Sequence, residues 1–84
     1  MKLWAKIIKG EKLINNIVLK NNLTMTKANY EATLMEICHA LDVETPVTLN
    51  THYRYLVDFN IVKYLPRDFV DKVDYTLFTI ENIE

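Results

Sequence analysis

The chain is poor in the residues from which small catalytic and ligand sites are commonly built. Its 84 residues include one glycine, one cysteine and two prolines. A single glycine excludes the glycine-rich loops that hold nucleotide phosphates, and a single cysteine excludes paired-thiol zinc sites and Cys-x-x-Cys redox motifs. An intramolecular disulfide, which small secreted domains usually need, is excluded as well. We therefore expect a cytoplasmic protein without a cofactor.

Long hydrophobic runs are also missing. Lys6 and Lys9 interrupt the apolar start of the chain, so it lacks the continuous apolar segment of a signal peptide. No other stretch approaches the length of a transmembrane helix, and we expect no membrane association. Half of the residues are hydrophobic and a quarter are charged, as in ordinary globular proteins. The length predicts one domain over residues 1–84.

The net charge of −1 argues against a general nucleic-acid binder, which needs clustered lysine and arginine to neutralise phosphates. The charges are nevertheless unevenly distributed. Residues 1–30 hold six lysines and one acid, whereas residues 68–84 hold five acids and one lysine. If the last strand lies beside the first, cross-strand pairs of opposite charge would explain this polarity.

The hydrophobic pattern predicts two strands and then two helices. Residues 2–9 and 12–20 are rich in Ile, Val, Leu and Trp, and Gly10-Glu11 between them predicts a hairpin turn. Asn15-Asn16 interrupts the second strand, where we expect a bulge or a twist. Apolar residues at helical spacing predict a helix over 26–41, with Thr24 or Thr26 as its N-cap. Pro46 predicts the start of a second helix over about 47–59, with an exposed ion pair between Arg54 and Asp58.

The remaining segments predict two further strands. Residues 61–65 are β-branched and apolar, Pro66 ends them, and residues 73–83 follow a tight turn. The order is therefore β-β-α-α-β-β, which indicates an α+β fold. We expect a small antiparallel sheet of about four strands, with one long and one short helix on one face.

Three residues invite a catalytic or metal-binding interpretation, namely Cys38, His39 and His52. Cys38 and His39 are adjacent on a helix, so their side chains diverge by about 100°, and a thiol nucleophile paired with a base is not expected there. His52 would have to approach them through the fold. A minimal enzyme or metal-binding domain around His52, His39 and Cys38 is an alternative that requires this convergence. We assign no catalytic residue and no metal ligand.

The cluster His52-Tyr53-Arg54-Tyr55 combines aromatic and cationic side chains. Such a combination can stack nucleic-acid bases or bind a small ligand, and His52 and Tyr55 are the candidates because Tyr53 points toward the core. A half-buried, hydrogen-bonded imidazole is the competing structural interpretation of His52. Nucleic-acid binding through the basic N-terminal hairpin is a second alternative function.

Surplus apolar surface favours a protein contact. Trp4 and Ile8 lie on the second side of the first strand, and the predicted long helix carries a second row of residues opposite its core side. We therefore expect a small interaction or accessory protein that contacts a protein partner or a second copy of itself. The alternative is that the short helix covers this row. The candidate contact residues are Trp4, Ile8, Ala28, Ala32, Met35 and His39.

Four segments carry a resemblance: residues 1–9, 36–42, 46–59 and 69–74. They resemble a family of small, uncharacterised bacterial proteins, and the likeness covers most of the chain. Because these segments are not catalytic signatures, the resemblance implies a cytosolic bacterial domain and no particular activity.

Overall fold

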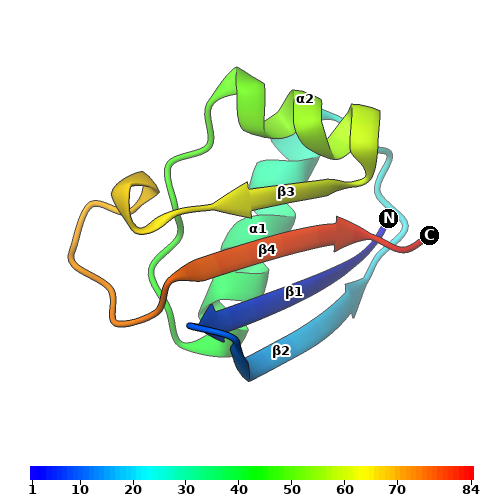
Figure 1. The fold of residues 1–84 in the computed structure, drawn as a ribbon. Helices are drawn as coiled ribbons and strands as arrows, with labels where there is room; N and C mark the ends of the chain where they lie inside the picture. Colours follow the sequence, from blue (N-terminus) through cyan, green and yellow to red (C-terminus); the bar gives the residue numbers. More distant parts are fainter.

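The chain folds into one four-stranded antiparallel sheet and two helices, and the computed structural model describes all of residues 1–84 (Figure 1). The strand order in the sheet is β2-β1-β4-β3, and every neighbouring pair is antiparallel. This confirms the predicted α+β fold and its element order. The strands are β1 (Lys2–Lys9), β2 (Lys12–Lys20), β3 (Ile61–Tyr64) and β4 (Leu77–Asn82); the helices are α1 (Lys27–Leu41), α2 (Asn50–Phe59) and the 3-10 turn η1 (Pro66–Asp68).

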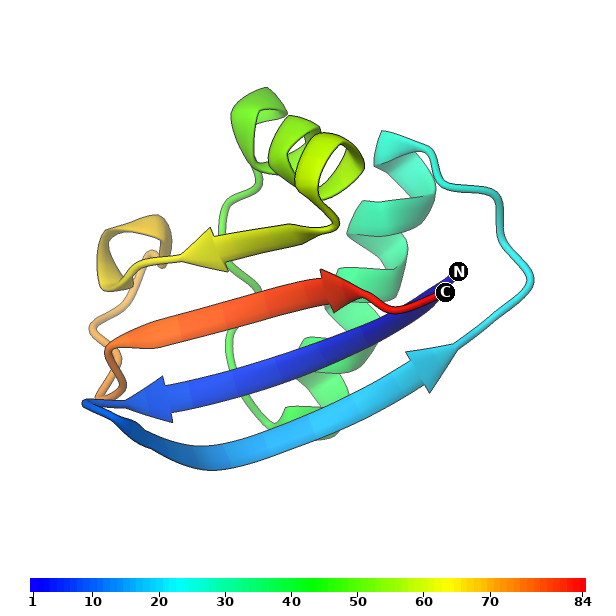
Figure 2. The same cartoon turned by 45° about the vertical axis from the view of Figure 1, so that its right-hand side comes forward.

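The helices cover one face of the sheet. Figure 2 shows α1 crossing behind the strands and α2 above β3, at one edge of the sheet. In β1 the side chains alternate, so that Leu3, Ala5 and Ile7 are buried under the helices while Trp4 and Ile8 are half-buried on the other side. One hydrophobic cluster fills the space between the sheet and the helices: Met1, Leu3, Ala5, Ile7, Tyr30, Leu34, Ile37, Cys38, Leu41, Leu56, Val62, Tyr64, Phe69, Tyr75, Phe78 and Ile80.

Both ends of helix α1 are set by the residues directly beside them in the chain. The Thr26 hydroxyl accepts a hydrogen bond from the Asn29 amide at 3.1 Å, which confirms Thr26 as the N-cap. Asp42 ends the helix in the left-handed conformation, with φ of 57°. The apolar residues at helical spacing that predict this helix are Tyr30, Leu34, Ile37 and Leu41, and all four are buried.

Helix α2 starts at Asn50, later than the sequence indicates, so the expectation that Pro46 opens it is wrong. The preceding segment is held by other partners. The Val47 amide donates to the Asp68 carbonyl at 2.8 Å, and the Thr48 hydroxyl is hydrogen-bonded to the Tyr64 hydroxyl at 3.1 Å. These contacts hold residues 45–49 in a non-helical conformation, so the helix begins only at Asn50.

The last strand is shorter than the predicted 73–83. Residues 69–76 form an irregular loop, and Glu44 holds its first part, with the carboxylate accepting from the Val70 amide at 2.8 Å and from the Asp71 amide at 3.3 Å. Phe69 and Tyr75 bury their rings beneath the loop and pack edge to face. Tertiary anchors therefore override the strand pattern here.

The pairing of β1 with β4 brings the basic and the acidic ends of the chain together. Lys6 forms an ion pair with Glu81 at 3.8 Å, and Lys9 forms one with Asp74 at 4.0 Å. Lys6 and Glu81 form one expected cross-strand pair of opposite charge, whereas Asp74 lies in the loop before β4, so the second ion pair joins a strand to a loop.

The hairpin β1–β2 contains the expected irregularity. Gly10 takes a φ of 63° in its turn, a conformation that favours glycine. Ile7 stands opposite Asn15 while Ile8 stands opposite Leu13, so Ile14 is an extra residue in β2. The bulge lies directly beside Asn15-Asn16, as the sequence predicts.

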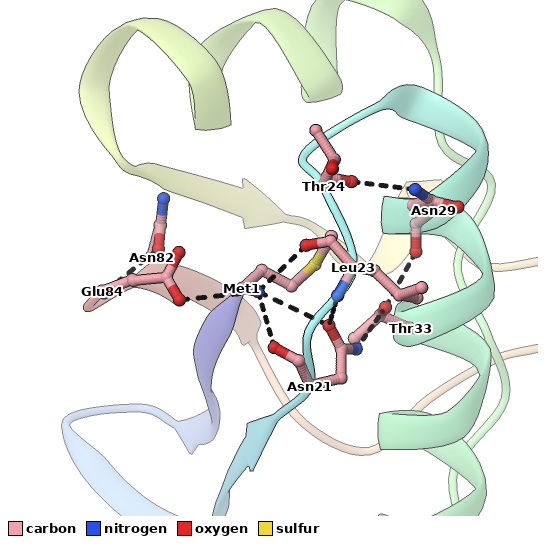
Figure 3. A network of polar contacts seen from close by, with 8 residues as sticks. All are labelled: Met1, Asn21, Leu23, Thr24, Asn29, Thr33, Asn82 and Glu84. Carbon is pink, nitrogen blue, oxygen red and sulfur yellow. Dashed lines mark hydrogen bonds and ion pairs between the residues drawn. The ribbon is translucent and has the colours of Figure 1, made fainter.

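A polar network ties the end of β2 to the start of α1 (Figure 3). The Asn21 side chain donates to the Thr33 hydroxyl at 3.1 Å and accepts from the Leu23 amide at 3.0 Å. The Met1 ammonium donates to the Asn21 carbonyl at 2.9 Å and to the Leu23 carbonyl at 3.1 Å. Together these bonds fix the turn by which the chain leaves the sheet for the helix layer.

Candidate interaction surface

The face of the sheet away from the helices has no cover, and we call it the open face. In the sheet register Trp4 stands opposite Val18, and Ile8 stands between Leu13 and Leu77. Residues that stand opposite each other on paired strands point to the same side of the sheet, so the strand register identifies the residues of the open face. It comprises Lys2, Trp4, Lys6, Ile8, Leu13, Asn16, Val18, Lys20, Ile61, Lys63, Leu77, Thr79 and Glu81.

Trp4 lies on the open face in the inner strand β1 and is held there by two side chains. Its indole nitrogen donates to the Asn16 side-chain oxygen at 3.2 Å, and the Lys6 ammonium lies 4.2 Å from its ring centroid. Cation–π contact and the hydrogen bond together orient the ring. One face of the indole is therefore already occupied within the chain.

Lysines dominate the charge of the open face. Four of its members are lysines and one is a glutamate, which is paired to Lys6. The apolar members are partly accessible, and Val18 is 48 % exposed. A basic surface with apolar positions between the charges matches a partner that is acidic and carries apolar side chains.

The second apolar row of α1, formed by Ala28, Ala32, Met35 and His39, is exposed, so α2 does not cover it. Met35 is its one large apolar side chain and is 61 % exposed. The remaining members offer little apolar area. This row is accordingly weaker as a contact surface than the open face.

The three residues considered for chemistry lie in different surroundings. Cys38 is fully buried in the core, and burial raises the pKa of its thiol to about 11. A thiol of this kind is protonated near neutral pH and is a poor nucleophile. His39 is exposed on the outer side of α1, and nowhere do three His, Cys, Asp or Glu side chains come close enough together to hold a metal ion.

His52 is engaged in holding the chain together. Its Nδ1 accepts a hydrogen bond from the Leu49 amide at 2.9 Å, which caps the start of α2. Its Nε2 lies 3.6 Å from the Asp68 carboxylate, and its ring stacks at 4.7 Å on Tyr64. The Asp68 carboxylate in turn accepts from the Leu65 amide at 2.8 Å. His52 thus joins α2 to the turn after β3, which favours the structural interpretation of this residue.

Tyr55 lies on the outer side of α2, next to Phe59, with ring centroids 5.7 Å apart. The two rings are 55 % and 64 % exposed. Together with Ile61, Val62 and Lys63 they line a groove of about 330 Å³ between α2 and β3, which we call the edge groove. Tyr55 is a candidate residue from the sequence, but the groove itself is not predicted there, because it also requires β3 to lie beside α2.

Comparison with known protein families, with curated proteins and with solved structures finds no match to this chain. The resemblance to a bacterial family stays a prediction. Neither helix has the length and apolar character that crossing a bilayer requires. The function is therefore argued from the geometry of the surfaces.

Proposed function

We propose that this chain is an interaction protein that binds an acidic protein partner through the open face. The observation that carries the proposal is the combination of Trp4, Ile8 and other apolar side chains with four lysines on a sheet face that no helix covers. Aromatic and aliphatic anchors give affinity at such a surface. Charges of opposite sign on the partner give orientation and speed of association.

The charge of the open face also argues against self-association through it. Two copies placed face to face would bring lysines against lysines, and like charges in an interface are unfavourable. The partner at this surface is therefore a different molecule.

A single-stranded nucleic acid is the second candidate for the open face, because lysines around a tryptophan also suit phosphates and bases. The contacts of Trp4 favour the protein partner. Base stacking needs a free ring face, and Lys6 already covers one of the two faces of the indole while Asn16 holds its nitrogen. A base that stacked on the Lys6 side of the ring would have to displace this cation.

The test is affinity capture from the host with matched variants, followed by binding measured with the purified partner. Ile8→Glu and Lys20→Glu change the open face away from β3, whereas Met35→Glu places the same charge on exposed α1 as a control. We expect a partner that binds the wild-type chain and Met35→Glu equally and binds both open-face variants at least about tenfold more weakly. Equal binding by all four proteins would refute the proposal.

The nucleic-acid candidate is tested separately by titrating the protein with an oligothymidylate and with polyglutamate. Trp4 is the single tryptophan, so its fluorescence reports on the open face directly. We expect a fluorescence change with polyglutamate at low salt and none with the oligothymidylate. The reverse result would favour the nucleic acid.

A further inference from the structure

Strand β3 lies at an edge of the sheet with part of its backbone unpaired. The Asn82 amide donates to the Asn60 carbonyl at 2.7 Å, and this bond sets the alternation of the β3–β4 ladder. Val62 and Tyr64 consequently turn their amides and carbonyls toward β4, while Ile61 and Lys63 turn theirs outward. No hydrogen bond within the chain uses these outward groups, which form a template for another strand.

The edge groove runs beside these same residues. Ile61, Val62 and Lys63 line one side of it, and Tyr55 and Phe59 of α2 line the other. Two exposed aromatic rings and an unpaired strand edge therefore form one continuous surface.

Two charges flank the rings. Arg54 and Asp58 are exposed one turn apart on α2, and the expected ion pair between them is not formed; the only i, i+4 pair in the chain joins Lys27 to Glu31. Each of these two side chains is thus available to a partner of opposite charge.

We propose that two copies of the chain pair through β3, in antiparallel register, to form an eight-stranded sheet. With a two-fold axis between the two Val62 residues, the outward groups of Ile61 meet those of Lys63 of the other copy. The two α2 helices then lie antiparallel across the axis. Tyr55 of one copy packs against Phe59 of the other.

The charges of α2 identify a second copy as the occupant. An isologous interface must be complementary to itself, so that each residue meets its partner twice. Antiparallel α2 helices bring Arg54 of one copy near Asp58 of the other, and the same contact repeats on the other side of the axis. The unpaired Arg54 and Asp58 have the arrangement that this symmetry requires.

The other edge of the sheet, formed by β2, is protected against pairing with another strand. In β2 the bulge at Ile14 distorts the strand, and the outward amide of Asn16 already donates to the Asn15 side chain at 2.9 Å. Bulges and locally satisfied amides are ways in which proteins protect edge strands. The edge of β3 is short and carries Lys63, but it has neither a bulge nor a locally satisfied outward amide along Ile61–Lys63.

The test is sedimentation velocity of the full chain from micromolar to millimolar concentration. We expect a species of twice the chain mass whose fraction rises with concentration. Lys63→Pro removes an outward amide without touching the β3–β4 ladder and should give a monomer. Lys63→Ala, which keeps the amide, and Val18→Pro, which removes an outward amide on β2, should remain dimeric. Circular dichroism of each variant checks that it is folded, and Phe59→Glu replaces Lys63→Pro if the latter does not fold.

Charge exchange tests the symmetry itself. Arg54→Asp and Asp58→Arg alone each place like charges across the axis and should raise the dimer dissociation constant about tenfold or more. The double variant restores opposite charges and should recover dimerisation. A wild-type chain that is monomeric at every concentration, or a dimer unaffected by Lys63→Pro, Phe59→Glu and both single exchanges, would overturn the proposal. Capture through the open face is measured with Ile8→Glu, so the two proposals fail independently.

Discussion

Replacing Tyr75 by phenylalanine should stabilise the protein. Tyr75 is 8 % exposed, its ring packs at 85° to Phe69, and its buried hydroxyl has no hydrogen-bond partner. A buried polar group without a partner costs about 1–3 kcal/mol, so removing the hydroxyl while keeping the ring should raise the free energy of unfolding by about 1 kcal/mol. For a domain of this size the melting temperature should then rise by about 4–8 °C.

The matched control is Tyr64→Phe, which makes the same chemical change in an opposite setting. The Tyr64 hydroxyl is hydrogen-bonded to the Tyr30 hydroxyl at 2.8 Å and to the Thr48 hydroxyl at 3.1 Å. Its removal leaves the Tyr30 hydroxyl buried without that partner, and stability should fall by about 1–3 kcal/mol. Urea unfolding followed by Trp4 fluorescence measures both variants, with an unchanged slope as the check on two-state behaviour. A loss of stability in Tyr75→Phe, or none in Tyr64→Phe, would refute the reasoning.

Three further outcomes are expected. His52→Ala should destabilise the protein by about 1 kcal/mol in urea unfolding, because the Leu49 amide loses its acceptor and Asp68 loses its neighbour; a loss no larger than in an exposed α2 variant would contradict this. Burial raises the pKa of Cys38 from 9.0 to about 11 and that of Tyr75 from 10.0 to about 12. Because the unfolded chain loses these two protons at lower pH than the fold does, their contribution to stability should be complete well below pH 9 and fall as pH rises from 9 toward 12; denaturation midpoints that do not move over this range would contradict the assignment. Cys38 should react with a disulfide reagent only at the rate of unfolding or local opening, and prompt labelling of the native protein would show that the thiol is accessible.

The sequence predicts those elements whose periodicity is long and whose end signals are local. The hairpin and α1 fall into this class, since Gly10 and Thr26 act within a few residues of the boundary they set. The start of α2 and the start of β4 do not. They depend on contacts of Val47 with Asp68 and of Glu44 with the loop after η1, which join residues far apart in the chain.

The same distinction applies to the candidate surfaces. Alternation placed Trp4 and Ile8 on one side of β1, and their exposure required only that the helices cover the other side. The edge groove required knowledge that β3 is an outer strand, which depends on the pairing of β1 with β4. One feature of the sequence does point to the groove: Tyr55 and Phe59 are one helical turn apart, directly before a short strand.

The strand order has a consequence for how the chain acquires its structure. The two central strands are the first and the last in sequence, with Leu3 opposite Asn82. The hairpin β1–β2 and helix α1 rely on local contacts and can form early, but the middle of the sheet must wait until residues 77–82 are available and a loop of nearly the whole chain is closed. Folding should therefore be slow for so short a chain and should complete only after synthesis of the last strand. Until then β1 presents an unpaired edge, and during that interval the lysines along it would keep nascent chains apart.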